Sequence, residues 1–178
     1  MAYSSITISG SMMAPTFAVY LFVIKTSSDT YYYVGMTGDN YYPSARSGIH
    51  RLAGHFDKSQ NSTQNQVQSI INDKEFNMDE LKVTMYHWPI DGFESWGTLK
   101  GFKRENLSEE ESKKYKNYLK KREQVYHLEQ YLIESLFTRD MKKGALQNKG
   151  RISEKHKKRP EGFDSIISEF EEIIASNQ

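Results

Sequence analysis

The stretch "FAVYLFVIKTSSDTYYYVGM", residues 17 to 36, is the clearest indication of the fold of this chain. Residues 17 to 25 are apolar, aromatic and β-branched, "TSSD" supplies turn residues, and residues 30 to 36 again favour a strand. We therefore predict a β-hairpin. If its loop has an even number of residues, Tyr20 and Tyr33 share one face within one pairing step, whereas an odd loop separates them.

Further elements follow the hairpin. Residues 43 to 56, "PSARSGIHRLAGHF", predict a helix that starts near Ser44, and residues 64 to 73 predict a second helix. The alternation in residues 81 to 89, "LKVTMYHWP", predicts a third strand. Residues 90 to 107, rich in glycine and aromatic residues, predict an excursion from the core.

The longest helix signal covers residues 108 to 137, where Ser108 and Glu111 have capping-box spacing. Steps of 100° per residue place Glu129 near the middle of its apolar face. A buried carboxylate is costly unless it is paired, hydrogen-bonded or bound to a metal, so Glu129 most needs a partner. The apolar face itself consists of Tyr118, Val125, Leu132, Ile133 and Leu136.

Composition limits the class of protein. With 178 residues, 37% hydrophobic and 26% charged, the chain predicts one compact globular domain rather than a disordered one. The absence of cysteine excludes disulfides, thiolate metal sites and a cysteine nucleophile. The apolar run near the start is too short to span a bilayer and lacks a basic leader, so we expect a cytoplasmic protein without membrane contact. Residues 139 to 159 are strongly basic, which suits phosphate contact and a solvated surface loop equally well.

The order of these elements resembles the GIY-YIG nuclease superfamily. "AVY" stands where that family has Gly-Ile-Tyr, and "YVG" matches its Tyr-Ile-Gly element. "RLAGHF", "LEQYLI" and "ALQNKG" match the family's arginine and histidine, its metal-binding glutamate and its late asparagine. The resemblance covers residues 17 to 150, and its strength lies in the order of the motifs. The functional positions that it implies are Tyr20, Tyr33, Arg51, His55, Glu129 and Asn148.

Two departures from the family pattern are visible. Ala18 replaces the first glycine, and Met36 stands where many relatives carry a lysine. Any assistance by lysine would then come from elsewhere, and Lys25 is the nearest candidate.

A rival pair, Arg46 and His50, has the same four-residue spacing as Arg51 and His55. It would project from the polar side of the predicted helix, so we favour Arg51 and His55. In the family's chemistry His55 would relay a proton or hold a tyrosine, and Asn148 would close the site by hydrogen bonding.

The resemblance implies metal-assisted hydrolysis of a phosphodiester. Glu129 would hold one Mg²⁺ or Mn²⁺, which polarises a phosphate oxygen and stabilises the leaving oxygen. Tyr20, with Tyr33 hydrogen-bonded nearby, would orient and deprotonate the attacking water. Arg51 would lower the pKa of the tyrosine and stabilise negative charge on the phosphate.

The resemblance therefore implies an endonuclease for double-stranded DNA, with restriction-type sequence specificity supplied by residues 90 to 107 and by the basic segment after Asn148. A non-catalytic DNA-binding module on the same fold, a homing or repair nuclease, and an RNA target are the alternatives. One active site per chain leads us to expect a homodimer on DNA, unless the strands are nicked in succession.

The expected fold class is α+β, a small three-stranded antiparallel sheet flanked by helices. Residues 1 to 16 are expected to be a flexible lead-in, and residues 17 to 150 a GIY-YIG-like core with an insertion near residues 90 to 107. Residues 151 to 178 would add a basic loop and an amphipathic helix as a C-terminal extension.

Overall fold

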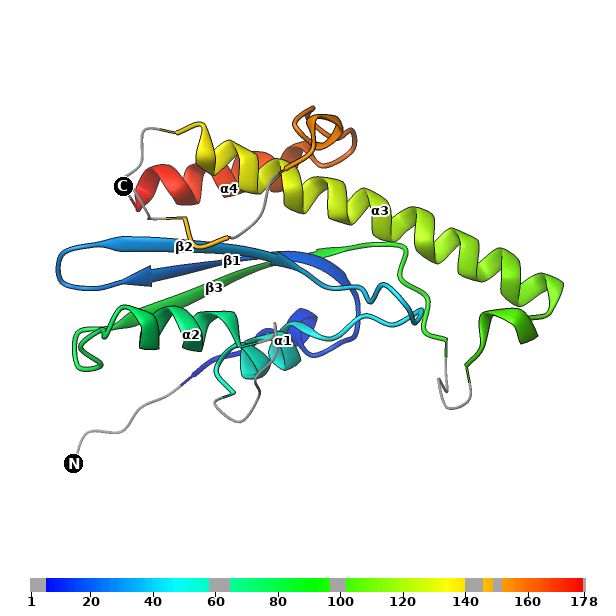
Figure 1. The fold of residues 1–178 in the computed structure, drawn as a ribbon, viewed down its shortest axis with the longest axis horizontal. Coiled ribbons are helices and arrows are strands. Elements are labelled where there is room, and N and C mark those ends of the chain that lie inside the picture. Colours follow the sequence, from blue (N-terminus) through cyan, green and yellow to red (C-terminus); the bar gives the residue numbers. More distant parts are fainter. Residues whose placement is uncertain (1–5, 58–64, 97–101, 140–145, 149–151, 178) are drawn as a thin grey trace.

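The fold is that of a computed structural model, which describes residues 6–57, 65–96, 102–139, 146–148 and 152–177. Within these ranges it is an α+β arrangement of one three-stranded antiparallel sheet and four α-helices, as expected (Figure 1). The strands are β1 Phe17–Lys25, β2 Thr30–Met36 and β3 Lys82–Ile90. The α-helices are α1 Gly48–His55, α2 Gln66–Asp73, α3 Glu109–Phe137 and α4 Asp164–Ser176. Short 3-10 helices lie at η1 Gly10–Met12, η2 Arg104–Asn106 and η3 Glu154–His156.

The predicted hairpin is confirmed, and its loop has the even length that places both tyrosines on one face. β1 and β2 pair with Tyr20 opposite Gly35 and Phe22 opposite Tyr33. Tyr20 and Tyr33 are therefore diagonal neighbours on one face of the sheet. β3 pairs with the other side of β1, where His87 lies opposite Tyr20, and the strand order is β2-β1-β3.

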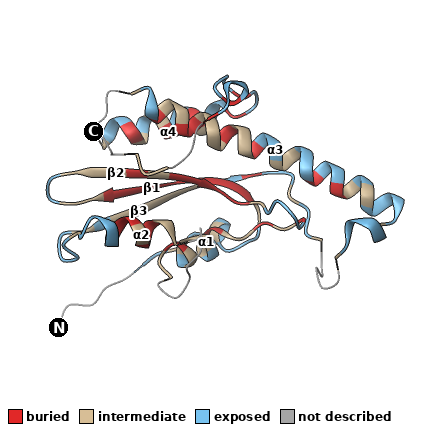
Figure 2. Ribbon diagram, in the orientation of Figure 1, coloured by how far each residue is buried: buried red, intermediate tan, exposed pale blue. Residues whose placement is uncertain are grey.

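β1 is the central strand and is buried on both faces (Figure 2). Successive side chains of a strand point to opposite faces, so β1 contributes to two cores. α3 and α4 cover one face, and α1 and α2 cover the other (Figure 1). The first core contains Val19, Leu21 and Val23 from β1, and the second contains Tyr20, Phe22 and Ile24.

The N-terminal half of α3 extends beyond the sheet (Figure 1). The helix starts with the predicted capping box: Ser108 accepts a hydrogen bond from the Glu111 N–H, and Glu111 accepts one from the Ser108 N–H. The described part of the expected excursion packs its aromatic rings on this half of α3. Residues 97 to 101 of that excursion lie outside the described residues. The ring contacts are made by Phe93, Trp96, Phe102, Tyr115 and Tyr118.

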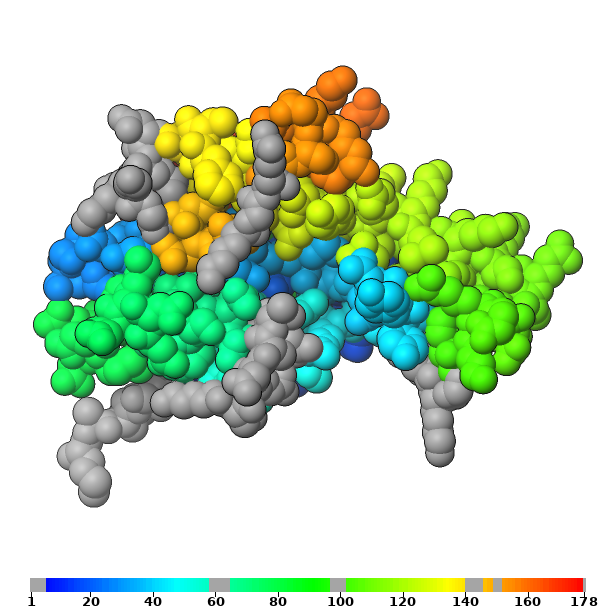
Figure 3. Space-filling model, in the orientation of Figure 1, coloured from blue at the N-terminus to red at the C-terminus, as the bar shows by residue number. Residues whose placement is uncertain are grey.

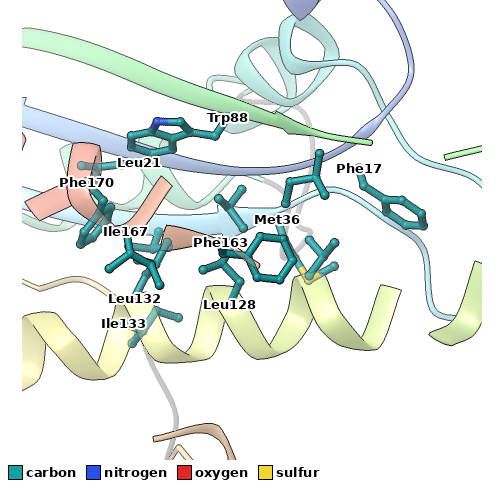
Figure 4. Close-up of a cluster of buried hydrophobic side chains, with 14 of the residues drawn as sticks. Phe17, Leu21, Met36, Trp88, Leu128, Leu132, Ile133, Phe163, Ile167 and Phe170 are labelled. Atoms are coloured by element: carbon teal, nitrogen blue, oxygen red, sulfur yellow. The ribbon is translucent and has the colours of Figure 1, made fainter. Parts of the chain in front are cut away.

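α4 belongs to the main core and is not a peripheral extension. Phe170 is fully buried, and its ring lies 6.1 Å from that of Trp88 in β3 (Figure 4). The indole N–H of Trp88 donates to Glu169 Oε2 at 2.9 Å. The predicted amphipathic pattern is confirmed, because Ile167 and Ile174 are also fully buried.

α1 starts later than predicted. Its N-cap is Ser47, whose hydroxyl accepts from the His50 N–H at 3.3 Å, and the helix begins at Gly48 rather than near Ser44. The residues before Ser47 instead follow a loop closed by a hydrogen bond from the Asp39 N–H to the Ser44 carbonyl. As a result Arg46 is not on the helix.

The expected lead-in is partly ordered. Residues 10 to 12 form a 3-10 helix, and Thr37 Oγ1 donates to the Thr16 carbonyl at 2.6 Å. Within the described ranges no helix has both the length and the apolarity needed to cross a bilayer.

The basic segment carries ion pairs where the structure describes it. Lys155 lies 3.0 Å from Glu123, and Arg159 lies 2.8 Å from Asp164. Lys157 contacts Glu154 at 2.8 Å. These carboxylates reduce the positive charge that the segment offers to phosphates, while residues 140–145 and 149–151 lie outside the described residues.

Candidate active site

Tyr20 and His55 form the centre of the candidate site. The Tyr20 hydroxyl lies 2.9 Å from His55 Nε2, and both residues are 2% exposed. The His55 ring also packs edge-on against Phe22 and Tyr33, with centroid distances of 4.9 and 5.2 Å. The hairpin and α1 thus bring together two predicted tyrosines and the predicted histidine.

Gly35 explains why a glycine ends the "YVG" motif. The Tyr20 ring lies across the backbone of Gly35, its partner in the adjacent strand. A Cβ atom at this position would lie 2.4 Å from Tyr20 Cζ and from its hydroxyl oxygen. Any side chain at residue 35 would therefore displace the tyrosine from His55.

The protonation states in this centre follow from burial. Burial, followed by the nearby Arg51, lowers the pKa of His55 to about 4, so the imidazole is neutral at pH 7. Burial also raises the pKa of Tyr20, and Tyr33 and Glu129 add to this effect, whereas Arg51 lowers it. A protonated hydroxyl either donates to Nε2 of an imidazole that carries its proton on Nδ1, or accepts from an Nε2–H group. Nδ1 is buried and has no hydrogen bond to the described residues.

Tyr33 lies beside this pair but does not match one expectation. Its hydroxyl forms no hydrogen bond within the described parts of the chain, so the expected hydrogen bond near Tyr20 is absent there. Burial raises the pKa of Tyr33, Glu129 raises it further, and Arg51 lowers it. Its place at the site comes from contact with the His55 ring.

Arg51 interacts electrostatically with the other ionisable groups of the candidate site. It is partly buried, and its charge acts on Tyr20, Tyr33 and His55 as well as on Glu129. Its Nε atom is buried without a hydrogen bond to any described residue. A buried guanidinium nitrogen with no acceptor is rare in proteins and is satisfied when an anion binds.

Glu129 reaches this group from α3. Burial raises the pKa of its carboxyl to about 7, although Gln130, Arg51, Arg122 and the backbone N–H of Met36 all lower it. Gln130 Nε2 donates a hydrogen bond to Glu129 Oε2 at 3.4 Å, and among the described residues no cation lies within ion-pair distance of the carboxylate. Arg122, an obvious candidate partner, donates to the Gly38 carbonyl at 3.4 Å instead.

Glu129 fits a magnesium ion that keeps most of its water. The described residues contain no group of three or more histidine, cysteine or acidic side chains that would hold a metal. Mg²⁺ binds through one or two carboxylates and retains several water ligands, so a single unpaired carboxylate is sufficient. A carboxyl that is half protonated near neutral pH because of burial gains stability when a cation binds beside it.

Asn148 hydrogen-bonds to strand β2 rather than closing the site as expected. Its Oδ1 accepts from the Val34 N–H at 2.9 Å and its Nδ2 donates to the Val34 carbonyl at 2.7 Å. The neighbouring Gln147 N–H donates to the Tyr32 carbonyl at 2.9 Å. The segment therefore covers the outer edge of β2, and both polar groups of Asn148 are used by the strand that carries Tyr33.

The rival pair and the alternative lysine are separated from the centre. His50 is exposed on α1, whereas His55 is buried against Tyr20. Arg46 lies in the loop before α1 and lines a small cavity together with Arg51. Lys25 pairs with Thr30 and Lys82 at the hairpin end. It lies five positions along β1 from Tyr20, about 16 Å away, so it does not replace the missing lysine.

His87 was not identified from the sequence. It lies opposite Tyr20 in β3, and both its ring nitrogens are buried without hydrogen bonds to the described residues. Burial lowers its pKa, so it is neutral. Its ring packs on Gly48, where a Cβ atom would lie 2.8 Å from Cδ2. The alternation of β3 was the available signal, since it places His87 on the face of Tyr20.

In comparisons with known proteins, no family model, curated protein or solved structure matches this chain.

Proposed function

We propose that this protein is a metal-dependent endonuclease that hydrolyses phosphodiester bonds in double-stranded DNA, with a GIY-YIG-like active site. The contact that carries the proposal is the buried Tyr20–His55 pair at 2.9 Å. Arg51, on the same helix as His55, acts electrostatically on both residues of this pair, and Glu129 from α3 acts on Tyr20. Restriction-type sequence specificity and a homodimer on DNA are part of the same proposal.

The attack on phosphorus would use a proton relay. The water oxygen forms a bond to phosphorus while one water proton moves to the Tyr20 oxygen and the tyrosine proton moves to His55 Nε2. The P–O ester bond breaks, and the leaving oxygen takes a proton from solvent. Because burial raises the pKa of Tyr20, this relay is favoured over a free phenolate, which would need a large cationic field.

The remaining groups would stabilise charge. Arg51 donates hydrogen bonds to the phosphate oxygens through its planar guanidinium. Glu129 would hold Mg²⁺ or Mn²⁺, which would polarise the phosphate and stabilise the leaving oxygen when bound. Asn148 supports the site indirectly, because it fixes the outer edge of β2.

A DNA-binding module that does not cut is the second candidate. It is favoured by the raised pKa of both tyrosines and by Met36 in the position where the resemblance leads us to expect a lysine. The two candidates differ in whether Mg²⁺ leads to strand breaks.

Cleavage of supercoiled plasmid and phage genomic DNA with Mg²⁺ or Mn²⁺ tests the proposal. We expect the wild type to cut, Glu129→Gln to lose at least about 100-fold in rate, and Glu110→Gln, an exposed acid on the same helix, to cut normally. If the wild type shifts duplex DNA in a gel but never nicks it, the non-catalytic module is correct. If Glu129→Gln cuts like the wild type, the metal assignment is wrong.

A further inference from the structure

Gly38 forms a turn just after β2 that two arginines approach from different helices. Its φ of 112° is one that favours glycine, and a Cβ atom there would lie 3.1 Å from Phe17 Cε1. From α3, Arg122 Nε donates to the Gly38 carbonyl at 3.4 Å. From α1, Arg51 lines a small polar cavity of about 70 Å³ that Gly38 also lines. The turn at Gly38 is therefore shared by the two arginines.

Further hydrogen bonds hold this turn in place. The Tyr118 hydroxyl on α3 donates to the carbonyl oxygens of Asp39 and Ser44, at 2.9 and 2.8 Å. The Asp39 N–H donates to the Ser44 carbonyl at 2.9 Å. In Figure 3 the light-blue residues near position 40 lie at the surface, beside the yellow-green residues of α3. The turn is thus fixed by α3 and lies next to a surface that a large partner can reach.

Arg122 is oriented but has unused hydrogen-bond donors. Its Nε is bound to Gly38, and its guanidinium carbon lies 5.9 Å from the centroid of the Tyr126 ring. Neither Nη atom is buried or forms a hydrogen bond to a described residue. Among the described residues no carboxylate lies within ion-pair distance of this guanidinium. Its Nη atoms can therefore donate to an anion that comes from outside the chain.

Arg122 also lies close to the proposed metal ligand. It precedes Glu129 on the same face of α3 by two helical turns, about 11 Å along the axis. Burial raises the pKa of the Glu129 carboxyl, and the charges of Arg51 and Arg122 both lower it. Arg122 nevertheless forms no ion pair with Glu129. An arginine beside this carboxylate that is not paired with it is available to the substrate.

We propose that Arg122 is a second phosphate-binding residue of the site, which holds the phosphate next to the scissile one on the cleaved strand. Arg51 is assigned to the scissile phosphate, and Arg122 reaches the same turn from α3. A DNA strand carries one phosphate for about every 3.4 Å of helix axis, so a strand that crosses Gly38 presents successive phosphates to both arginines. This inference rests on the proposed nuclease function and says where the cleaved strand runs: across Gly38, between α1 and α3.

The salt dependence of DNA binding tests the charge contact. Variants made in the Glu129→Gln background bind a short duplex without divalent metal. Arg122→Ala should weaken binding roughly tenfold or more and reduce the slope of log affinity against log salt by about 1. Arg122→Lys should keep the slope because it keeps the charge. Lys120→Ala removes an exposed lysine on the opposite face of α3 and should leave the slope nearly unchanged.

A purely structural role for Arg122 leads to a different result. Arg122→Gln keeps a side-chain N–H group for the Gly38 carbonyl but carries no charge. If Arg122 acts only by holding the turn, glutamine should restore DNA affinity and the salt slope. We expect instead that Arg122→Gln shows the reduced slope of Arg122→Ala. A slope that glutamine restores and lysine does not would overturn the inference.

A neutral phosphate analogue tests the position of the contact. Once the cut is mapped, a single methylphosphonate, which lacks the phosphate charge, replaces the phosphate on each side of the scissile one in turn. At one of these positions it should weaken binding by the Glu129→Gln parent but have little further effect in Arg122→Ala, because the contact is already lost. Additive losses at both positions would refute the assignment to a neighbouring phosphate.

The outcomes separate this inference from the proposed function. Normal affinity and salt slope in Arg122→Ala, with cleavage that depends on Glu129, would refute the second arginine and uphold the nuclease. A reduced slope in Arg122→Ala, with a wild type that binds but never nicks DNA, would uphold the phosphate contact and refute its place beside a cleaved bond. A protein that neither binds nor cuts DNA would refute both proposals.

Discussion

Glu129 is the residue at which folding and the proposed chemistry conflict. Burial raises the pKa of its carboxyl from 4.5 to about 7, which means that ionising it costs free energy in the folded protein. The unfolded chain ionises the same group near pH 4.5 without this cost. The conflict is resolved if a cation binds at the carboxylate.

From the raised pKa of Glu129 we predict that the stability of the metal-free protein depends on pH. Between pH 4.5 and about 7 the folded state binds more protons at this residue than the unfolded state, so its contribution to the free energy of unfolding falls as pH rises. The free energy of unfolding falls by about 3 kcal/mol at most. This loss is complete above pH 7 and absent below pH 4.5. Urea unfolding of the wild type and Glu129→Gln across this range measures it.

The contribution of His55 to stability changes with pH in the opposite direction over part of that range. Its pKa of about 4 lies below the ordinary value of 6.5, so its contribution is lost as pH falls from 6.5 to 4. The difference between the wild type and Glu129→Gln removes this shared effect. If that difference is independent of pH, the carboxyl is not buried as described; if Mg²⁺ stabilises both proteins equally, Glu129 does not hold the ion.

At the scale of elements, β2 is an edge strand with both of its sides occupied. β1 covers one side, and residues 146 to 148 cover the other through Gln147 and Asn148. An uncovered edge would expose backbone groups to water and to other chains. The short segment therefore supports the strand on which Tyr33 and Gly35 lie.

Asn148→Ala tests whether this asparagine supports the strand or contacts the substrate. It should lower the free energy of unfolding by about 1–3 kcal/mol, because two hydrogen bonds to the Val34 backbone are lost. Under conditions where the variant is folded, we expect the cleavage rate at saturating DNA to fall less than about tenfold. Unfolding curves and single-turnover cleavage give both values. A loss of about 100-fold in rate with unchanged stability would instead show direct action on the phosphate.

At the scale of the whole molecule, the helices that support the candidate site share one hydrophobic core with the sheet. α3 and α4 pack together on the first core, and the same α3 supplies Glu129 and the Tyr118 that holds the loop before α1 (Figure 4). The C-terminal helix thus stabilises the helix that positions Glu129. A separate extension would have no such effect.

Phe170→Ala tests this single core. The ring is fully buried against Trp88, so its removal should lower the free energy of unfolding by about 3–5 kcal/mol. Helix content and the tertiary signal of Trp88 should be lost in one transition on heating, since α4 and the sheet share one core. Circular dichroism in the far and near ultraviolet follows the two signals. Ile166→Ala, at a partly buried position of α4, should cost clearly less. Two separate transitions would mean that α4 folds as an independent unit.

Local sequence patterns were enough to predict the helices and strands and the faces on which their side chains lie. The hairpin of residues 17 to 36, the third strand and the amphipathic helices follow from local periodicity, which depends only on neighbours within a few residues. The same periodicity placed Tyr20 with Tyr33, conditional on a loop of even length. It also placed Glu129 on the apolar side of α3.

Tertiary structure alone decided which polar groups meet. Ser47, not Ser44, caps α1, so Arg46 joins a loop while His55 is buried against Tyr20. Asn148 uses both its polar groups on the edge of β2. The basic segment forms ion pairs with acidic side chains from α3, from α4 and from within the segment. These outcomes depend on distances between residues far apart in the chain. Burial, hydrogen bonding and pKa arise from such distances, and local patterns do not encode them.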